Sequence, residues 1–266
     1  MSGDFTSEWL TLREPADSRA RNAGLLSRLV AIATELDIED AVDLGCGTGA
    51  TWRAMPADLA ERLAWTMADR DALLLQEAGR QIGPRANVSY RSLELADLAA
   101  IPIPDRGLVT ASALFDLCSQ HWIDGFVPRI TTSGAVLYAA LTHDGRVSFA
   151  PESAADGLVC TAFEAHQRSD KGLGPAMGPD AAPYLAARLR DAGMNVLEAP
   201  SDWILTQADA RLQRAYLDGY AAALHDDPSL PQGLLDGWLS HRFSSIDGGE
   251  ASCVVGHCDI LAWPRR

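Results

Sequence analysis

The hydrophobic positions of this chain fall into short apolar runs separated by longer segments with helical spacing. Seven runs have the length and composition of buried strands, and they span residues 40–44, 63–68, 88–95, 108–116, 135–141, 194–199 and 251–262. Between them, apolar residues recur every three or four positions, as in 72–81 and 206–224. This alternation predicts an α/β protein with a mostly parallel sheet covered by helices.

Three segments depart from the alternation. Residues 4–35 precede the first strand and have helical spacing, so we expect a short helix, a turn at Pro15 and a longer helix. The fifth strand is expected to end at Leu141, with a loop over 142–146. Residues 148–178 then contain six Pro or Gly residues and are interpreted as an insertion. Asp247-Gly248-Gly249 has the composition of a hairpin turn before the last strand.

One stretch is unusually rich in glycine, and it reads Ala41-Val42-Asp43-Leu44-Gly45-Cys46-Gly47-Thr48-Gly49-Ala50. A buried strand runs here into three alternate glycines and then a helix, which lets a ligand approach the backbone and the N–H groups of that helix. The spacing Gly45-x-Gly47-x-x-Ala50 also satisfies the dinucleotide-binding pattern. Asp43 favours another ligand, because its carboxylate would repel a pyrophosphate and attract an ammonium group.

The pattern Asp-x-Gly-x-Gly-x-Gly over 43–49 resembles the first motif of class I S-adenosylmethionine (SAM) dependent methyltransferases. The resemblance implies a Rossmann-like three-layer sandwich with a seven-stranded, mostly parallel sheet and an antiparallel C-terminal strand. It also implies that SAM is the cofactor and that Asp43 orders its amino group. The residues that would hold its methionine end are Gly45, Cys46, Gly47 and Gly49. The implied organisation is a helical lid over 1–36 and a methyltransferase domain over 37–266, with a substrate-side insertion at 147–178.

The resemblance extends to the ends of the next two strands. Asp69 lies 20 residues after Gly49, about the spacing at which an acid meets a ribose diol, so it is carried over as the ribose ligand with Arg70 beside it. Asp71 is the competing candidate, although a helix N-cap is its simpler role. Glu94 and Leu95 take the adenine-contacting places; the family more often has Asp, and Asp97 could substitute.

Two further cofactor contacts are expected. Arg21, in a charged stretch before the first strand, would reach the SAM carboxylate from the lid as a bidentate pair. Ser112 lies at the mouth of the fourth strand, which in this family faces the transferable methyl group. Gly107 departs from the family, which usually has Asp before this strand.

Methyl transfer to oxygen or nitrogen can require a base, and three residues are candidates for it. They are His143 at the end of the fifth strand, His166 in the polar part of the insertion, and Asp116 after the fourth strand. Each also has a structural interpretation, as a packed histidine or as a helix cap. His257 lies inside the last strand and is interpreted as structural.

Two other functions remain open at this point. One is an NAD-dependent Rossmann oxidoreductase, which is disfavoured because no Tyr-x-x-x-Lys pair is present and because NAD-binding folds usually end in parallel strands. The other is a non-catalytic SAM-binding partner subunit, which the departures at Glu94 and Gly107 would allow.

The amino-acid composition restricts the classes of binding partner that we expect for this chain. The 266 residues include 22 basic and 36 acidic side chains, a formal charge of −14, which argues against nucleic acid and for a small-molecule methyl acceptor. The five cysteines include no Cys-x-x-Cys, and Cys253, His257 and Cys258 lack two further ligands at zinc spacing, so no metal is expected. Without an evident leader or membrane-length apolar run, we expect a cytoplasmic monomer or homodimer.

Overall fold

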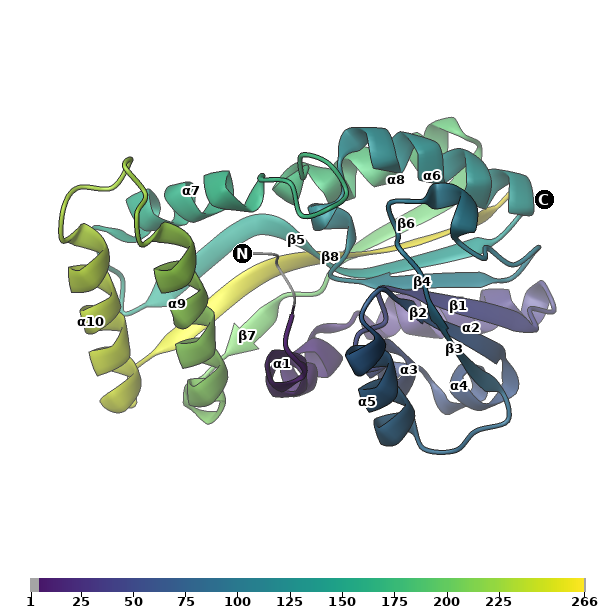
Figure 1. The fold of residues 1–266 in the computed structure, drawn as a ribbon, viewed down its shortest axis with the longest axis horizontal. Helices are drawn as coiled ribbons and strands as arrows, with labels where there is room; N and C mark the ends of the chain where they lie inside the picture. The colour runs from purple at the N-terminus through teal and green to yellow at the C-terminus, as the bar shows by residue number, and fades with distance from the viewer. Residues whose placement is uncertain (1–4, 266) are drawn as a thin grey trace.

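An eight-stranded sheet runs through the molecule and includes all seven predicted strands (Figure 1). The structure is a computed structural model that describes residues 5–265. The strand order is β3-β2-β1-β4-β5-β8-β6, and β7 pairs with β8 beyond β6. The strands are β1 Asp40–Leu44, β2 Ala64–Asp69, β3 Val88–Ser92, β4 Leu108–Ser112, β5 Val136–Ala150, β6 Met194–Pro200, β7 Trp203–Leu205 and β8 Ser252–Pro264.

The strand directions match the predicted fold class. Strands β1 to β5 pair in parallel, whereas β8 is antiparallel to β5, β6 and β7. The Rossmann-like prediction with an antiparallel C-terminal strand is therefore confirmed, but the sheet has eight strands and not seven, because β7 pairs with β8 and was not predicted. In such a sheet the carboxyl ends of the parallel strands meet at one edge, which is where ligands bind.

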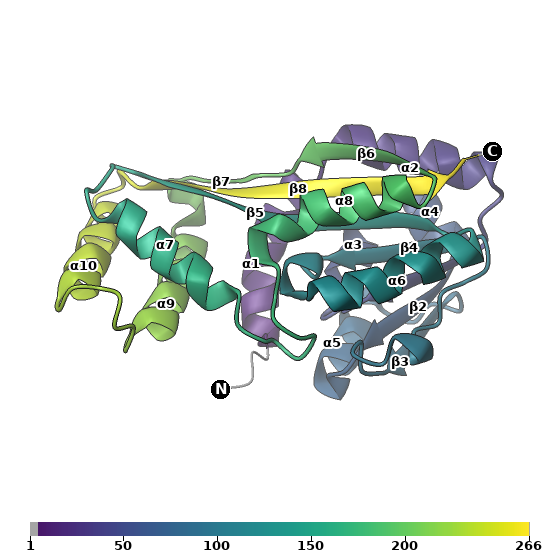
Figure 2. The same ribbon diagram turned by 90° about the horizontal axis from the view of Figure 1, so that it is seen from above.

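Helices cover both faces of the sheet. Leu29 of α2 and Leu59 of α4 are buried with one face, and Phe126 of α6 and Leu185 of α8 with the other. Figure 2 shows α2 and α8 on opposite sides of β8. The helices are α1 Ser7–Ala20, α2 Ala23–Glu35, α3 Ala50–Ala54, α4 Ala57–Arg62, α5 Ala72–Ile82, α6 Gln120–Ser133, α7 Asp156–Gln167, α8 Ala181–Asp191, α9 Ala210–Leu224 and α10 Leu234–Asp247.

Strands β5 and β8 continue beyond the parallel sheet as a long antiparallel ribbon. Helices α7, α9 and α10 and strand β7 pack around its far end, and we call this part the distal lobe (Figure 1). Its core is aromatic and includes Phe149, Trp203, Tyr220 and Trp238. The prediction that the fifth strand ends at Leu141 was wrong, because β8 pairs with β5 as far as Ala150 and this distant partner leaves no mark on the local pattern.

The N-terminal helices break at a different residue from the one predicted. Pro15 lies inside α1, and the turn comes instead at Arg21 and Asn22. Asn22 separates α1 from α2, because its side chain caps α2 by accepting from the N–H of Leu25 at 3.1 Å. Residues 1–4 of the predicted lid lie outside the described residues.

Three other boundaries differ from the sequence pattern. Strands β3 and β4 end at Ser92 and Ser112, so Glu94 and Asp116 lie in the segments that follow them. The expected hairpin turn at 247–249 is instead the C-terminal end of α10, with Gly248 as its C-cap. The prediction was wrong because a pair of glycines has the same local composition whether it ends a helix or connects two strands.

Candidate functional site

The glycine loop connects β1 to α3 at the carboxyl edge of the sheet. Gly45, Gly47 and Gly49 have φ angles of 63°, 52° and 81°, in the left-handed region that favours glycine. A Cβ on Gly47 would lie 2.9 Å from Leu10 Cδ1 of α1. The loop thus needs glycine both for its backbone and for the close approach of α1.

Helix α1 covers the loop and is tied to it by one arginine. Arg53 donates to both carboxylate oxygens of Glu14 on α1, from Nε at 2.7 Å and from Nη2 at 2.6 Å. Its Nη1 donates to the carbonyl of Thr48 in the loop at 2.6 Å. Residues 46–49 are buried as a result, so a ligand on this loop would be enclosed under α1.

Asp43 is the buried acid beside the loop. Its Oδ1 accepts from the Thr110 hydroxyl at 2.7 Å, whereas Oδ2 has no partner. Burial raises the pKa of the Asp43 carboxyl to about 7, against the opposing effects of the Thr110 hydrogen bond and the Arg21 guanidinium. A cation placed at Oδ2 would favour the ionised form.

Arg21 reaches this edge from the turn between α1 and α2. Its side chain is buried, and Nη2 donates to Ser112 Oγ at 3.0 Å and lies 3.5 Å from Thr51 Oγ1. The other two donor atoms, Nε and Nη1, have no partner. A buried guanidinium with two free donor atoms and a buried carboxylate with a free oxygen therefore occur at the same edge.

These unpaired atoms belong to a larger group. Buried polar atoms in folded proteins are nearly always paired, so such a concentration requires an explanation. The unpaired atoms at the carboxyl edge are Arg21 Nε and Nη1, Asp43 Oδ2, Thr48 Oγ1, Asp116 Oδ1, Thr142 Oγ1 and His143 Nε2. They offer a cation, two acids, two hydroxyls and an imidazole to a polar ligand.

Asp69 closes β2 next to the loop. Its Oδ2 accepts from the N–H of Gly47 at 2.8 Å and its Oδ1 from the N–H of Asp71 at 2.9 Å. Asp71 caps α5 by accepting from the N–H of Leu73 at 2.8 Å, which confirms the simpler of its two interpretations. Arg70 is exposed and lies beside Gly172 of the insertion.

The segment after β3 reaches the loop through Leu95 and not through Glu94. The Leu95 side chain lies beside Gly45, and its carbonyl accepts from Trp122 Nε1 at 2.7 Å. Glu94 is exposed. Asp97 is also exposed and accepts from the N–H of Ala99 at 3.1 Å, as the cap of a short 3-10 helix.

Asp116 and His143 are brought together by the turn after β4 and by β5. Burial raises the pKa of the Asp116 carboxyl, and the nearby His143 imidazole opposes the shift. Burial lowers the pKa of His143, which keeps the ring neutral near pH 7. Nδ1 of His143 accepts from the N–H of Gly145 at 3.3 Å, which assigns the ring proton to Nε2.

His166 and His257 have different surroundings. His166 lies at the end of α7, where burial and the Lys171 charge lower its pKa and Asp227 opposes them. His257 is buried on β8, with its ring centroid 5.3 Å from Trp203 and 5.8 Å from His143. Among the three candidate bases, only Asp116 and His143 are linked by their mutual influence on pKa.

The sequence matches no protein-family model and none of the curated proteins. Solved structures do match it. A candidate methyltransferase from Bacillus halodurans C-125 is 14% identical with a TM-score of 0.51, over 90% of this chain and 100% of the other. The YcgJ protein from Bacillus subtilis is 14% identical with a TM-score of 0.51, over 92% and 100%. A methyltransferase from Thiobacillus denitrificans in complex with S-adenosylhomocysteine is 16% identical, with a TM-score of 0.45 over 97% and 98%.

The fold is that of class I SAM-dependent methyltransferases. Its antiparallel C-terminal strand, β8, is the feature that was expected to separate a methyltransferase fold from an NAD-binding one. Among the described helices, none combines the length and the apolar character that crossing a bilayer requires.

Several residues of this edge of the sheet were not predicted from the sequence. Thr51, Thr110 and Thr142 contribute hydroxyls, and Asp259 on β8 holds Tyr138 and the backbone of Asn22. Asp259 alone carried a signal, because an acid between apolar residues of a buried strand is costly without partners. The threonines carried none.

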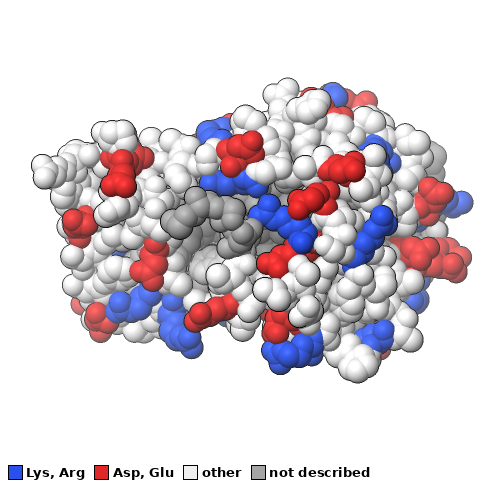
Figure 3. Space-filling model, viewed as in Figure 1, with Lys and Arg blue, Asp and Glu red and all other residues white. Residues whose placement is uncertain are grey.

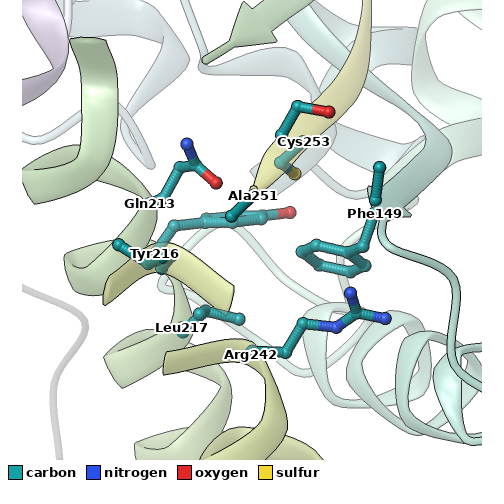
Figure 4. Close-up of a pocket in the computed structure, with 10 residues that line it drawn as sticks. Phe149, Gln213, Tyr216, Leu217, Arg242, Ala251 and Cys253 are labelled. Atoms are coloured by element: carbon teal, nitrogen blue, oxygen red, sulfur yellow. The ribbon is translucent and has the colours of Figure 1, made fainter. Parts of the chain in front are cut away.

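Two hollows lie away from the glycine loop. A cavity of about 10 Å³ in the distal lobe is lined by residues including Gln213, Tyr216 and Arg242 (Figure 4). This leaves room for about one water molecule, which is too little for a cofactor. A second hollow, of about 250 Å³, lies at the opposite edge of the sheet, beside Asp37, Asp40 and Arg106.

Proposed function

We propose that the chain is a SAM-dependent methyltransferase that acts on a small molecule. The supporting observation is the combination of free donors on Arg21 with the free Oδ2 of Asp43 under α1. The guanidinium fork matches a carboxylate and the Asp43 carboxylate matches an ammonium group, so the two together fit the zwitterionic amino-acid end of SAM.

The rest of the proposed cofactor site follows the edge of the sheet. The backbone of Gly45, Cys46, Gly47 and Gly49 would lie along the methionine part, and Ser112 would border the methyl group. Asp69 would bind the ribose hydroxyls through its remaining lone pairs, with Arg70, Glu94 and Leu95 around the adenosine. Bound SAM supplies a methyl group on a positively charged sulfur, and the protein aligns the acceptor with it.

We assign the proton transfer to Asp116 and the positioning of the acceptor to His143. The raised pKa of Asp116 brings a carboxylate closer to the range where a general base works best. The Nε2–H of His143 has no partner, so it is available to donate a hydrogen bond to the acceptor. This makes His166 the weakest of the three candidate bases.

The Asp116 carboxylate and the Nε2–H of His143 together favour an oxygen nucleophile over a nitrogen nucleophile. A hydroxyl oxygen has two lone pairs, so it can accept from His143 Nε2–H with one and attack the methyl carbon with the other. Its proton would pass to Asp116 as the new O–C bond formed and the bond between the sulfonium sulfur and the methyl carbon broke, which would leave S-adenosylhomocysteine as the second product. A neutral amine has one lone pair, and a hydrogen bond from His143 would occupy the pair that has to react.

The charge distribution supports a small acceptor. The chain has a formal charge of −14, and on the described part of the face in Figure 3 basic and acidic side chains are interspersed. Nucleic acid needs a continuous basic surface. All five cysteines are free, which fits a reducing, cytoplasmic location.

Calorimetric titration of the protein with S-adenosylhomocysteine, SAM and NAD tests the proposal. We expect the first two to bind and NAD not to bind; the reverse ranking would reject the cofactor. A tritiated-methyl assay against fractionated host metabolites then tests transfer. Cofactor binding without transfer to any fraction would instead support the non-catalytic subunit.

A further inference from the structure

Asp259 is a fully buried carboxylate at the centre of β8. It accepts three hydrogen bonds from three parts of the chain. Its Oδ2 accepts from the Tyr138 hydroxyl at 2.8 Å and from the N–H of Asn22 at 3.0 Å, and its Oδ1 accepts from the N–H of Leu141 at 2.9 Å. A buried acid is stable only with such partners, so this arrangement fixes all three donors relative to β8.

Two of the three donors are backbone N–H groups that lie outside the regular hydrogen-bond pattern of a strand or a helix. Leu141 has a φ of 55° and lies in an irregularity of β5, where the pairing with β8 shifts between Ala139 and Thr142. Asn22 is the N-cap of α2, and the first N–H groups of a helix have no acceptor within the helix. Asp259 thus fastens the turn between α1 and α2 to the sheet.

Arg21 is the residue immediately before Asn22. Its backbone position is fixed on one side by the N–H of Asn22 on Asp259, and its side chain reaches Ser112 on β4 at 3.0 Å. Because Nε and Nη1 are buried and have no partner of their own, the direction of these donors depends on how the turn is held.

We propose that Asp259 is a positioning residue that sets the specificity of the site for ligands with a carboxylate, by fixing Arg21. This rests on the proposed function, since Arg21 is assigned there to the carboxylate of SAM. Asp259 contacts no ligand in this scheme. Its loss weakens the recognition of the amino-acid end and leaves the recognition of the nucleoside end unchanged.

Two ligands separate this role from a merely structural one. S-adenosylhomocysteine carries the amino-acid end, whereas 5′-methylthioadenosine has the same adenine, ribose and sulfur without it. For Asp259→Asn, which keeps the shape but replaces one acceptor oxygen by a donor, we expect affinity for S-adenosylhomocysteine to fall by about tenfold. Affinity for 5′-methylthioadenosine stays within about twofold of the wild-type value.

Two variants complete the calorimetric experiment. Asn22→Ala is the matched control, because it removes the cap on α2 and keeps the N–H that binds Asp259. It should lower the melting temperature without changing the ratio of the two affinities. The double variant Arg21→Ala with Asp259→Asn should bind S-adenosylhomocysteine no more weakly than Arg21→Ala alone, since both changes remove one interaction.

Equal weakening of both ligands by Asp259→Asn, no weakening of either, or additive effects in the double variant would overturn the proposal. If Asp259→Asn does not fold, Tyr138→Phe takes its place, because it keeps the buried acid and removes the hydroxyl that interacts with both Asp259 and Arg21. It should shift the ratio of affinities in the same direction by a smaller factor. If the wild-type protein binds neither ligand, the proposed function fails, which is a different result from a failure of Asp259.

Discussion

Arg21 donates from Nη2 to the hydroxyl of Ser112 at 3.0 Å, across 91 positions of sequence. This bond joins the turn between α1 and α2 to the mouth of β4, and it leaves the other two donor atoms of the guanidinium free and buried. The helix that covers the glycine loop and the strand that borders the proposed methyl position are therefore linked by one side chain.

The first prediction concerns that side chain. Arg21→Lys keeps the charge and loses the planar fork, so affinity for S-adenosylhomocysteine should fall by about tenfold or more in calorimetric titration. Ser112→Ala removes the tether but leaves the guanidinium in place, so it should have the smaller effect. Equal affinity of Arg21→Lys and the wild type would remove Arg21 from the site.

The second prediction concerns pH. The pKa of Asp43 is raised to about 7, so the ligand-free protein holds a proton there that a bound ammonium group would expel. Affinity for S-adenosylhomocysteine should therefore rise between about pH 6 and pH 8, with proton release that appears as a dependence of the binding heat on the buffer. Asp43→Asn should bind weakly and without this pH dependence.

The same pKa has a consequence for stability. Because the folded-state pKa lies above the ordinary value of 3.8, the contribution of Asp43 to ligand-free stability is lost as pH rises towards about 7. The melting temperature of Asp43→Asn relative to the wild type should therefore increase from about pH 4 to pH 8. A constant difference would mean that the carboxyl is ionised throughout.

The third prediction separates Asp116 from His143. Asp116→Asn should strongly reduce methyl transfer and leave affinity for S-adenosylhomocysteine near the wild-type value, since it removes the proposed base. His143→Gln retains a side-chain N–H donor and should keep more activity than His143→Leu. If the two His143 variants were equally inactive while binding the cofactor normally, His143 would be the base.

The fourth prediction concerns Asp69. Asp69→Ala leaves the N–H groups of Gly47 and Asp71 without their acceptor and removes the proposed ribose ligand. We expect binding of S-adenosylhomocysteine to weaken by about 1–3 kcal/mol. Asp71→Ala is the control, since it removes only the cap of α5 and should lower the melting temperature with little change in affinity.

The architecture was predictable where local pattern and fold agree. Strand β1 was predicted at its observed bounds, because a buried strand followed by a glycine loop leaves little freedom in its position. Helix α5 was predicted to within one residue, since Asp71 and Gly83 mark its two ends. The path of β5 beyond Leu141 was not predictable, because a partner more than a hundred residues away decides it.

The site was predictable in part for the same reason. Asp43 and Asp69 follow buried strands next to a motif, so their spacing in sequence indicated where they lie. Arg21 was chosen from the charged character of its stretch, but the turn that aims it was expected at Pro15. Thr110 and Thr142 could not be found, because a threonine in a strand has the same pattern whether it packs or binds.

The irregularity of β5 at Leu141 also determines which way the side chains after it point. Between the pairs Ala139–Ile260 and Thr142–Cys258, β5 advances by three residues while β8 advances by two. Side chains alternate along a strand, so this odd residue decides which way Thr142 and His143 point. Because the Leu141 N–H also donates to Asp259, deleting Leu141 would remove one of the three donors on that acid and turn the side chains of Thr142 and His143 to the opposite side of the strand. One residue in β5 thus determines which side chains after the irregularity lie on each face of the strand.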